Sequence, residues 1–253
     1  MLFLFPTPKQ TAGRVEYMQA GGHPAVFEGV NFTKHCKTDG ELRFYEGYGA
    51  LPGGLRRFIP APVRVDRARG DITMENVLYG HERYVIVDFK LGRLPFGRNL
   101  CEERYQKRVR KATETTSSAF GFRFTGMAVH VGPARLNIDK SEGRRTTYEE
   151  TRFLVRDVLY GAGEPGVVSD AISRVVEQLT DLKSALKASA VVPQGSSALL
   201  LFDLAAPERS LVRMIDFTYA YVSDGRPYQL ADQQGTLDGI DNLVAFLDGI
   251  RCE

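Results

Sequence analysis

The sequence predicts an α+β protein made of two lobes. The chain has 253 residues, of which 43% are hydrophobic, and this is enough to bury a substantial core. Short strand-like runs gather in residues 10–74, whereas longer helical patterns occur from residue 101 onward. We therefore expect a small N-terminal lobe in residues 1–76, built from an antiparallel sheet and one helix, and a larger α+β C-terminal lobe in residues 77–253.

Composition and charge exclude several classes of protein. Lysine and arginine number 33 against 31 acidic residues, so the net charge of +2 gives no sign of a polyanionic partner. The apolar run at residues 1–5 is cut off by Pro6, which makes it too short for a signal peptide or a membrane span. Three cysteines lie far apart without metal-ligand spacing: Cys36, Cys101 and Cys252. We expect a reduced intracellular setting, cytoplasmic or nuclear, for a monomer with no transmembrane segment.

The N-terminal region predicts a strand followed by a helix. Residues 25–34 are strand-like and end at Lys34. Residues 39–46 favour a helix start, with Asp39 as the N-cap and acidic side chains near the positive end of the helix dipole. The glycine-rich stretch at 47–54 lacks the Gly-Lys-Ser/Thr ending of a P-loop, so we expect it to be a plain connection.

The next strand ends in an acid and a base placed two residues apart. Residues 84–92 read YVIVDFKLG. In an extended chain, residues i and i+2 share one face, so Asp88 and Lys90 project together while the alternate apolar residues pack on the other side. Gly92 then lets the backbone turn away. A strand end with a solvated ion pair is the simpler interpretation of these residues taken alone.

A cluster of cations follows this strand. Residues 101–112 contain no glycine or proline that would stop a helix. Within this helix Arg104, Lys107, Arg108 and Lys111 fall at i, i+3, i+4 and i+7, which places them on one face. Because like charges repel, a polyanion is one candidate partner, and a solvated basic face is the other. Nucleic acid is not expected, since stacking aromatics and a broader basic surface are missing.

The second half of the chain alternates strands and helices. Residues 120–130 alternate as a half-buried strand, and helices are predicted at 148–160, 167–186 and 238–250. Two further apolar runs present Ser197 and Asp216, and hydroxyl and carboxylate oxygens are ligands that magnesium prefers. The helix at 167–186 carries an apolar stripe of Ile172, Val175, Val176, Leu179, Leu182 and Leu186. The four histidines show no metal-site spacing, and we expect none of them to be catalytic.

These segments, in order, resemble the inositol polyphosphate kinase family. The central match is residues 84–92, which resemble its P-x-x-x-D-x-K-x-G signature with Tyr84 in place of proline. The other matching segments are 41–45 (E-x-x-F-Y), 72–77 (the hinge between lobes), 103–111 (the basic substrate helix), 121–127 (G-F-R-x-x-G-M), 139–144 (D-K-x-x-G-R), 196–200 (S-S-L-L, with Ala198 for the first leucine), 215–217 (I-D-F) and 238–243 (D-G-x-x-N-L).

The resemblance implies a two-lobed fold similar to protein kinases and ATP-grasp enzymes, with an inositol-phosphate-binding helical insert at about residues 99–118. It implies a phosphotransferase that uses ATP and Mg²⁺ to phosphorylate hydroxyls of soluble inositol tris- and tetrakisphosphates, as a multikinase does. The alternatives are a trisphosphate 3-kinase, a hexakisphosphate kinase, or a catalytically weak scaffold or sensor that binds inositol phosphate or nucleotide.

The resemblance also assigns roles to residues. For the nucleotide, the backbone of Glu75 and Val77 would bind adenine and Asp88 the ribose. Either Lys34 or Lys37 would steady the phosphates, with Lys34 preferred because Glu41 in the next helix completes a kinase-like pair. Asp216 and Ser197 would hold Mg²⁺, with Ser196 as an additional candidate, and Lys90 would sit where the phosphoryl group is transferred. The residues implied for the ring phosphates are Lys90, Arg93, Arg104, Lys107, Arg108 and Lys111.

Overall fold

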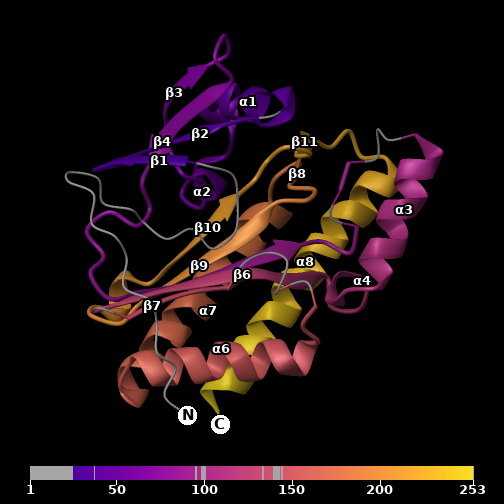
Figure 1. Cartoon of the computed structure of the whole chain (residues 1–253). Coiled ribbons are helices and arrows are strands. Elements are labelled where there is room, and N and C mark those ends of the chain that lie inside the picture. Colours follow the sequence, from indigo (N-terminus) through magenta and orange to yellow (C-terminus); the bar gives the residue numbers. More distant parts are fainter. Residues whose placement is uncertain are drawn as a thin grey trace.

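The computed structural model of the chain describes residues 25–36, 38–94, 96–97, 101–132, 134–138, 143 and 145–252. Figure 1 shows a small sheet with helices above a larger sheet, and long helices packed beneath the larger one. This arrangement confirms the predicted α+β class. In the described part of the chain, no helix combines the length and apolar character needed to cross a membrane.

The small sheet has four antiparallel strands, in the order β1-β2-β4-β3. The strand predicted at residues 25–34 is a hairpin instead, because Gly29 takes a positive φ of 58° and turns the chain between Glu28 and Asn31. The elements are β1 (Ala25–Glu28), β2 (Asn31–His35), α1 (Asp39–Glu46), η1 (Tyr48–Ala50), α2 (Gly53–Arg56), β3 (Pro62–Asp66) and β4 (Asp71–Glu75).

Two local predictions in this region were wrong. The N-cap of α1 is Thr38, and Asp39 is the first helical residue, where its carboxylate accepts hydrogen bonds from Arg43 and Arg67. The glycine-rich stretch at 47–54 is not a plain connection, because it contains η1 and the start of α2. The predicted lobe boundary at residue 76 falls between β4 and the next strand and stays a prediction.

The larger sheet has five antiparallel strands in the order β10-β9-β5-β6-β7, so β5 lies at its centre. A separate two-stranded pair, β8 with β11, lies near one end of it in Figure 1. The strands are β5 (Tyr84–Leu91), β6 (Phe122–Val131), β7 (Ala134–Ile138), β8 (Val191–Val192), β9 (Ser197–Asp203), β10 (Leu211–Ile215) and β11 (Tyr221–Val222), and η2 (Pro207–Arg209) precedes β10.

The two faces of the larger sheet are covered differently. We call the face packed by the long helices the outer face, and the face directed at the small sheet the inner face. Val87 and Phe89 of β5 belong to the main core on the outer face, whereas Ile86 belongs to a smaller cluster that includes Leu199. Phe27 of β1 and Val77, which follows β4, pack against this smaller cluster. The predicted alternation of β5 is therefore confirmed.

The helices lie close to their predicted positions, except that α8 begins much earlier. The helices are α3 (Glu102–Thr113), α4 (Thr116–Phe120), α6 (Tyr148–Ala162), α7 (Pro165–Lys187) and α8 (Pro227–Arg251). Helix α8 begins at Pro227 rather than at residue 238, because proline is favoured in a first helical turn. Phe120 belongs to α4, and β6 is buried on both faces over residues 122–129 rather than half-buried. The α7 stripe lies in the core, with Val176 half-buried.

A glycine contact attaches α4 to β5 and α8. Gly121 ends α4 with a φ of 68°, and its carbonyl accepts a hydrogen bond of 2.7 Å from the amide of Gly92. A Cβ at Gly239 of α8 would overlap the Gly121 carbonyl oxygen. Asn242 of α8 donates to the Phe120 carbonyl at 2.9 Å. These close approaches join β5, α4 and α8, and they need glycine on both sides.

Replacing Gly239 with alanine should destabilise the protein, because the added methyl has no space. Overpacking of this kind costs about 1–3 kcal/mol in the free energy of unfolding. Gly249→Ala is the matched control on the same helix, since its Cβ would meet only a terminal nitrogen of Arg152 at 3.4 Å. We expect Gly249→Ala to be neutral or stabilising by up to about 1 kcal/mol through helix propensity. Equal stabilities in urea denaturation would contradict the glycine contact.

Candidate functional site

Three polar side chains from different strands meet at one end of the larger sheet. In the sheet register Lys90 of β5 pairs with Ser197 of β9, and Ser197 pairs with Ile215 of β10. Asp216 follows Ile215 directly, and its Oδ2 lies 3.9 Å from Lys90 Nζ. The structure therefore places Lys90, Ser197 and Asp216 at the same end of the sheet, and the roles that the resemblance implies for them stay predictions.

Asp216 has an unusual backbone conformation. Its φ of 65° is the only positive value at a non-glycine residue in the described part of the chain. Aspartate tolerates the left-handed region better than most residues, and such conformations concentrate at functional sites. The side chain is 41% exposed, so its carboxylate is open to a ligand.

A buried lysine holds the other oxygen of this carboxylate. Lys34 Nζ donates to Asp216 Oδ1 at 3.0 Å and to Glu41 Oε1 at 2.9 Å. Burial by itself would lower the pKa of Lys34, but Asp216 and Glu41 outweigh burial and raise the pKa above its usual range. Lys34 is therefore a permanent cation between two carboxylates. The structure forms the predicted Lys34–Glu41 pair, and the competing Lys37 lies outside the described residues.

Cys36 borders the same ion cluster. Its Sγ lies 3.8 Å from Glu41 Oε2. Burial, and next the charge of Glu41, raises the pKa of the Cys36 thiol to about 12. The thiol stays protonated at neutral pH and is not a nucleophile.

Helix α1 is pressed against the chain that follows Asp216. The amide of Phe217 donates to Glu41 Oε1 at 3.4 Å. The Phe217 ring stacks on Phe44 of α1, with centroids 3.9 Å apart and an interplanar angle of 5°. A Cβ at Gly40 would overlap the carbonyl oxygen of Thr218. Sequence reasoning missed this contact, although Gly40 beside the predicted helix start was a signal for a close backbone approach.

The predicted hinge residues follow β4. The Glu75 amide donates to the Ala61 carbonyl at 2.9 Å, so this amide is already used. Of the Glu75 backbone groups, only the carbonyl could bind a ligand, by accepting a hydrogen bond from a ligand's donor. The Glu75 carboxylate accepts from Arg213 Nε at 3.4 Å. Val77 packs against the inner-face cluster beside Leu78. Adenine binding by Glu75 and Val77 stays a prediction.

Asp88 lies on the inner face, two residues before Lys90. Its neighbours across the sheet are Leu199 of β9 and Gly126 of β6. Asp88 is 4% exposed, so it is more deeply buried than Asp216. The structure confirms that Asp88 and Lys90 share a face, and the contact of Asp88 with a ribose stays a prediction.

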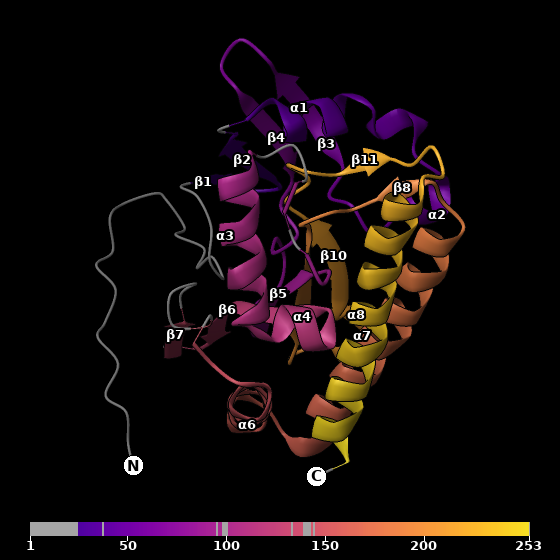
Figure 2. The same cartoon turned by 90° about the vertical axis from the view of Figure 1, so that its right-hand side faces the viewer.

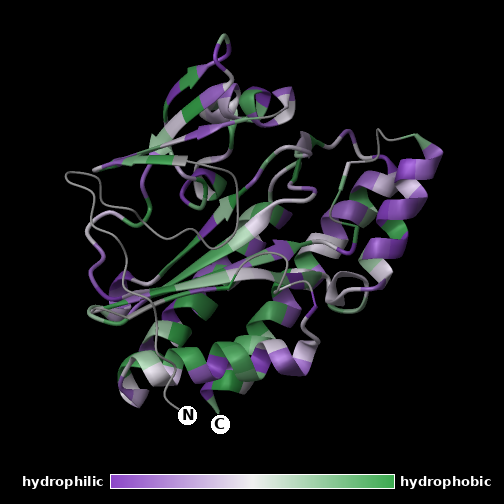
Figure 3. Ribbon diagram, viewed as in Figure 1, coloured by the Kyte–Doolittle hydropathy of each residue, from purple (hydrophilic) through white to green (hydrophobic). Residues whose placement is uncertain are grey.

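Helix α3 presents its cations away from the core. Arg104, Lys107 and Arg108 are exposed, and Lys111 is half-buried. Figure 3 shows α3 as mostly hydrophilic, and Figures 1 and 2 show it rising from α4 toward the level of the small sheet.

An aromatic contact links α3 to the neighbourhood of Asp216. Tyr105 of α3 contacts Phe96 with ring centroids 5.7 Å apart. The next residue, Gly97, lies against the ring of Tyr219. Tyr219 follows Asp216 by three positions, so these contacts connect the basic helix to the segment of chain that carries Asp216. The predicted turn at 139–144 lies outside the described residues, except for Gly143.

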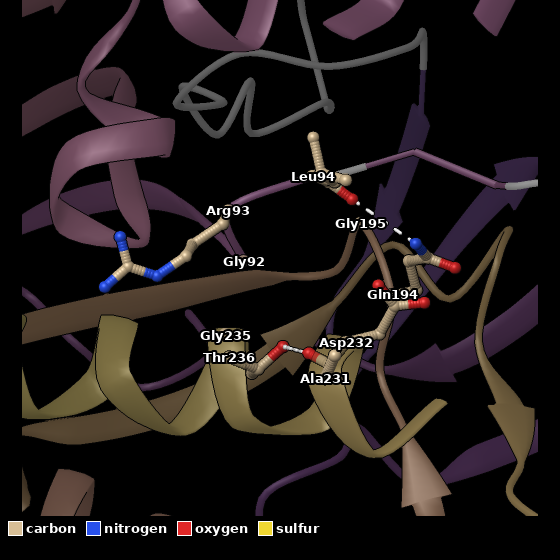
Figure 4. A pocket seen from close by; sticks show the side chains of 9 residues that line it. All are labelled: Gly92, Arg93, Leu94, Gln194, Gly195, Ala231, Asp232, Gly235 and Thr236. Atoms are coloured by element: carbon tan, nitrogen blue, oxygen red, sulfur yellow. Dashed lines mark hydrogen bonds between the residues drawn. The ribbon is translucent and has the colours of Figure 1, made fainter. Parts of the chain in front are cut away.

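Arg93 takes part in structural contacts. One terminal nitrogen donates to the carbonyls of Ser118 and Ala119 at 2.6 and 3.2 Å, and the other lies 3.4 Å from Asp238 Oδ2. Figure 4 shows this guanidinium directed away from a hollow of about 200 Å³ beside Gln194. In this structure Arg93 ties α4 to α8, and its predicted contact with ring phosphates stays a prediction.

The two residues predicted to hold Mg²⁺, Ser197 and Asp216, have side chains whose chemistry fits part of such a site. Ser197 is fully buried, and its hydroxyl has no hydrogen-bond partner among the described residues. The same part of the chain holds no group of three or more His, Cys, Asp or Glu side chains suited to a metal ion. Mg²⁺ commonly binds through one or two carboxylates plus waters and substrate phosphates. An unpartnered hydroxyl and one open carboxylate, Asp216, fit such a shared site.

One histidine has a structural role that the sequence did not indicate. His81 Nδ1 lies 2.6 Å from Asp203 Oδ2, and both side chains are buried. The other oxygen of Asp203 accepts from the amides of Ala205 and Ala206. This pair fixes the connection between β4 and β5 to the end of β9, away from Asp216. The prediction that none of the four histidines is catalytic stays a prediction.

Comparison with known proteins gives consistent results. The model of a family described as inositol polyphosphate kinase matches residues 71–248. The chain is 29% identical over 196 residues to an inositol polyphosphate multikinase of Saccharomyces cerevisiae. The matched stretch covers 74% of this chain and 51% of the relative. It is 23% identical over 209 residues to inositol hexakisphosphate kinase 3 of Mus musculus, covering 74% and 52%. The chain thus spans about half the length of these relatives.

Solved structures share the fold. The inositol phosphate multikinase Ipk2 of Saccharomyces cerevisiae, solved in complex with ADP and Mn²⁺, superposes with a TM-score of 0.75 at 20% identity. The match covers 87% of this chain and 99% of that one. A second inositol phosphate multikinase structure has a TM-score of 0.68 at 20% identity, covering 83% and 99%.

Proposed function

The chain belongs to the inositol polyphosphate kinase family, and we propose that it transfers the terminal phosphoryl group of ATP to a hydroxyl of a soluble inositol polyphosphate. The observation that carries this proposal is the meeting of Lys90, Ser197 and Asp216 at one end of the sheet, with Lys34 on the Asp216 carboxylate. The solved relative that holds ADP and Mn²⁺ supports a nucleotide and a divalent metal as ligands.

The nucleotide would lie along the inner face of the larger sheet. The backbone of Glu75 and Val77 would contact adenine, beside the apolar cluster that Val77 joins. Asp88 would accept hydrogen bonds from ribose hydroxyls. Lys34 would exchange part of its contact with Asp216 for a phosphate oxygen, and Glu41 would keep the ammonium in place. In phosphoryl transfer the protein acts mainly through positioning and electrostatic stabilisation.

Asp216 and Ser197 would hold the metal ion. A bound Mg²⁺ would neutralise charge on the phosphates of ATP. Lys90, which shares a row of the sheet with Ser197, would stabilise charge on the transferred group and orient the attacking hydroxyl. We assign no side chain as general base, because a loose transition state places little demand on one.

The cations of α3 would bind the ring phosphates. Arg104, Lys107 and Arg108 are exposed and lie on the helix that Tyr105 attaches near Asp216. Several phosphates on one small ring need several positive groups, and this face supplies them. We propose inositol tris- and tetrakisphosphates as substrates, as for a multikinase. The similarity to inositol hexakisphosphate kinase 3 supports the second candidate, a hexakisphosphate kinase.

The direct test is a kinase assay with a panel of inositol phosphates. The purified protein would be incubated with ATP, Mg²⁺ and inositol phosphates carrying three to six phosphates, and the products separated by ion-exchange chromatography. We expect turnover of tris- and tetrakisphosphates. Binding of inositol phosphate without turnover of any panel member would overturn the kinase proposal in favour of a scaffold or sensor.

Replacing Asp216 with asparagine should remove activity. Asparagine also tolerates the left-handed backbone at this position, so the fold should persist while the metal loses its anionic ligand. We expect kcat to fall by about a thousandfold or more, which corresponds to roughly 4 kcal/mol of transition-state stabilisation.

The matched control for this variant is Asp181→Asn. Asp181 of α7 forms an exposed ion pair of 2.8 Å with Arg57, which follows α2. This substitution therefore also removes an ion pair between distant parts of the chain but leaves the site intact. We expect its kcat to equal that of the wild type. A folded Asp216→Asn protein with near-normal turnover would show that Asp216 does not hold the metal.

Replacing Lys107 and Arg108 with alanine should weaken inositol phosphate binding selectively. Each charge-assisted contact contributes roughly 1.5–3 kcal/mol before solvent screening, so we expect KM for the inositol phosphate to rise about tenfold per residue and KM for ATP to stay unchanged. Higher ionic strength should weaken the wild type more than the variant, because the variant has fewer charges to screen.

Arg110→Ala serves as the control, since Arg110 is an exposed cation of the same helix outside the four-residue face. We expect its KM values to match the wild type. If the double variant and the control show the same KM for inositol phosphate, α3 does not bind the substrate.

A further inference from the structure

We propose that Thr125 is a further nucleotide-contacting residue, whose hydroxyl binds the ribose of ATP beside Asp88. The proposal rests on the proposed function, because it needs ATP to lie along the inner face. Thr125 belongs to none of the fixed positions of the motifs that identify the family segments in this sequence, and it lies on β6. Three observations carry the inference: a bulge, the direction of the side chain, and an unpartnered hydroxyl.

Thr125 is the extra residue of a β-bulge. In the register of β5 and β6, Asp88 pairs with Gly126, whereas the next residue, Phe89, pairs with Phe124. Thr125 therefore has no partner of its own on β5, and it sits between the two pairs. Bulges redirect side chains and are frequent next to active sites.

The bulge places Thr125 on the inner face. Phe124, which precedes the bulge, and Met127, which follows it, both pack in the outer-face core. Side chains alternate along a strand, so counting forward from Phe124 and backward from Met127 puts Thr125 and Gly126 together on the inner face. Gly126 has no side chain, and the polar group beside Asp88 at this point of β6 is thus the Thr125 hydroxyl.

This hydroxyl lacks a hydrogen-bond partner. Thr125 is 3% exposed, and its Oγ1 makes no hydrogen bond within the described part of the chain. A buried hydroxyl without a partner destabilises a fold, so its presence calls for a physical reason. Ser197, which we assign to the metal, shows the same property. A ligand that binds at the inner face would satisfy both groups.

The chemistry of a ribose matches the pair of Asp88 and Thr125. An ionised carboxylate only accepts hydrogen bonds, whereas a threonine hydroxyl can donate one and also accept one. One ribose hydroxyl would donate to Asp88, and the neighbouring ribose oxygen would accept from Thr125. The two side chains together would recognise a diol, which neither could do alone.

Thr125→Val tests this role, because valine keeps the shape and removes the hydroxyl. We expect the Kd for ATP with Mg²⁺, measured by calorimetry, to rise about threefold to tenfold, as for loss of one neutral hydrogen bond. The Tm of the ligand-free protein should rise, because an unpartnered buried polar group is gone. Affinity and stability thus move in opposite directions. Thr125→Ser should restore the affinity.

Deoxynucleotides show which ligand group Thr125 contacts. We expect wild type to bind both 2′-deoxy-ATP and 3′-deoxy-ATP more weakly than ATP, because one analogue lacks the hydroxyl that donates to Asp88 and the other lacks the oxygen that accepts from Thr125. For one of the two analogues, the one without the acceptor, Thr125→Val should bind as the wild type does, since the hydrogen bond is already missing. Ser117→Ala is the matched control: Ser117 is also buried with an unpartnered hydroxyl, but it lies on α4. Its affinity for ATP should be unchanged.

The outcomes separate the two proposals. If wild type binds ATP and Thr125→Val binds it equally well, the inference about Thr125 is overturned and the proposed function stands. The inference is also overturned if Thr125→Val weakens ATP and both deoxynucleotides by the same factor. If wild type shows no binding of ATP with Mg²⁺, the proposed function fails and this inference fails with it.

Discussion

The two regions of the molecule depend on one buried cation. The Lys34 ammonium comes from β2, Glu41 from α1 and Asp216 from the end of β10, and the lysine bonds both carboxylates. The Lys34 side chain is 13% exposed and Glu41 only 5%, so little water could replace either partner. For the Lys34–Glu41 pair, removing one partner leaves an uncompensated buried charge, at a cost of about 3–5 kcal/mol. The interaction that aligns Lys34, proposed to bind phosphate, with Asp216, proposed to bind the metal, therefore also joins the small sheet to the large one.

A single short segment of chain carries most of the contacts that support this ion cluster. Met214 donates its amide to the Phe58 carbonyl at 2.6 Å, and Phe217 stacks on Phe44. Because β10 is an edge strand of the larger sheet, the backbone groups on its unpaired side are available to the part of the chain that contains the small sheet. The strand that positions Asp216 is thereby held from both sides. The proposed chemistry needs such rigidity, since a misplacement of about 1 Å can cost a hundredfold in rate.

Much of this site could be predicted from the sequence because it depends on period and spacing. Alternation placed Asp88 and Lys90 on one face, and helical spacing placed the cations of α3 outside the core. What sequence could not predict depends on tertiary contacts. The pattern of β6 does not reveal that Thr125 is an extra residue, because a bulge is defined only against the partner strand. Likewise the carbonyls that bind Arg93 belong to α4, and no local pattern links a loop arginine to a distant helix end.

The attachment of α4 has a consequence for how this protein could change over time. Every hydrogen bond described between α4 and its supports ends on a main-chain carbonyl, from Ser118 to Gly121. Such contacts do not depend on which side chains the helix carries, apart from the glycine itself. Substitutions at the exposed positions of α3, such as Lys107 and Arg108, can therefore accumulate without loosening the joint. Selectivity for a different phosphorylated ring could evolve on the exposed face of α3 while the residues proposed to transfer the phosphoryl group stay unchanged on the sheet.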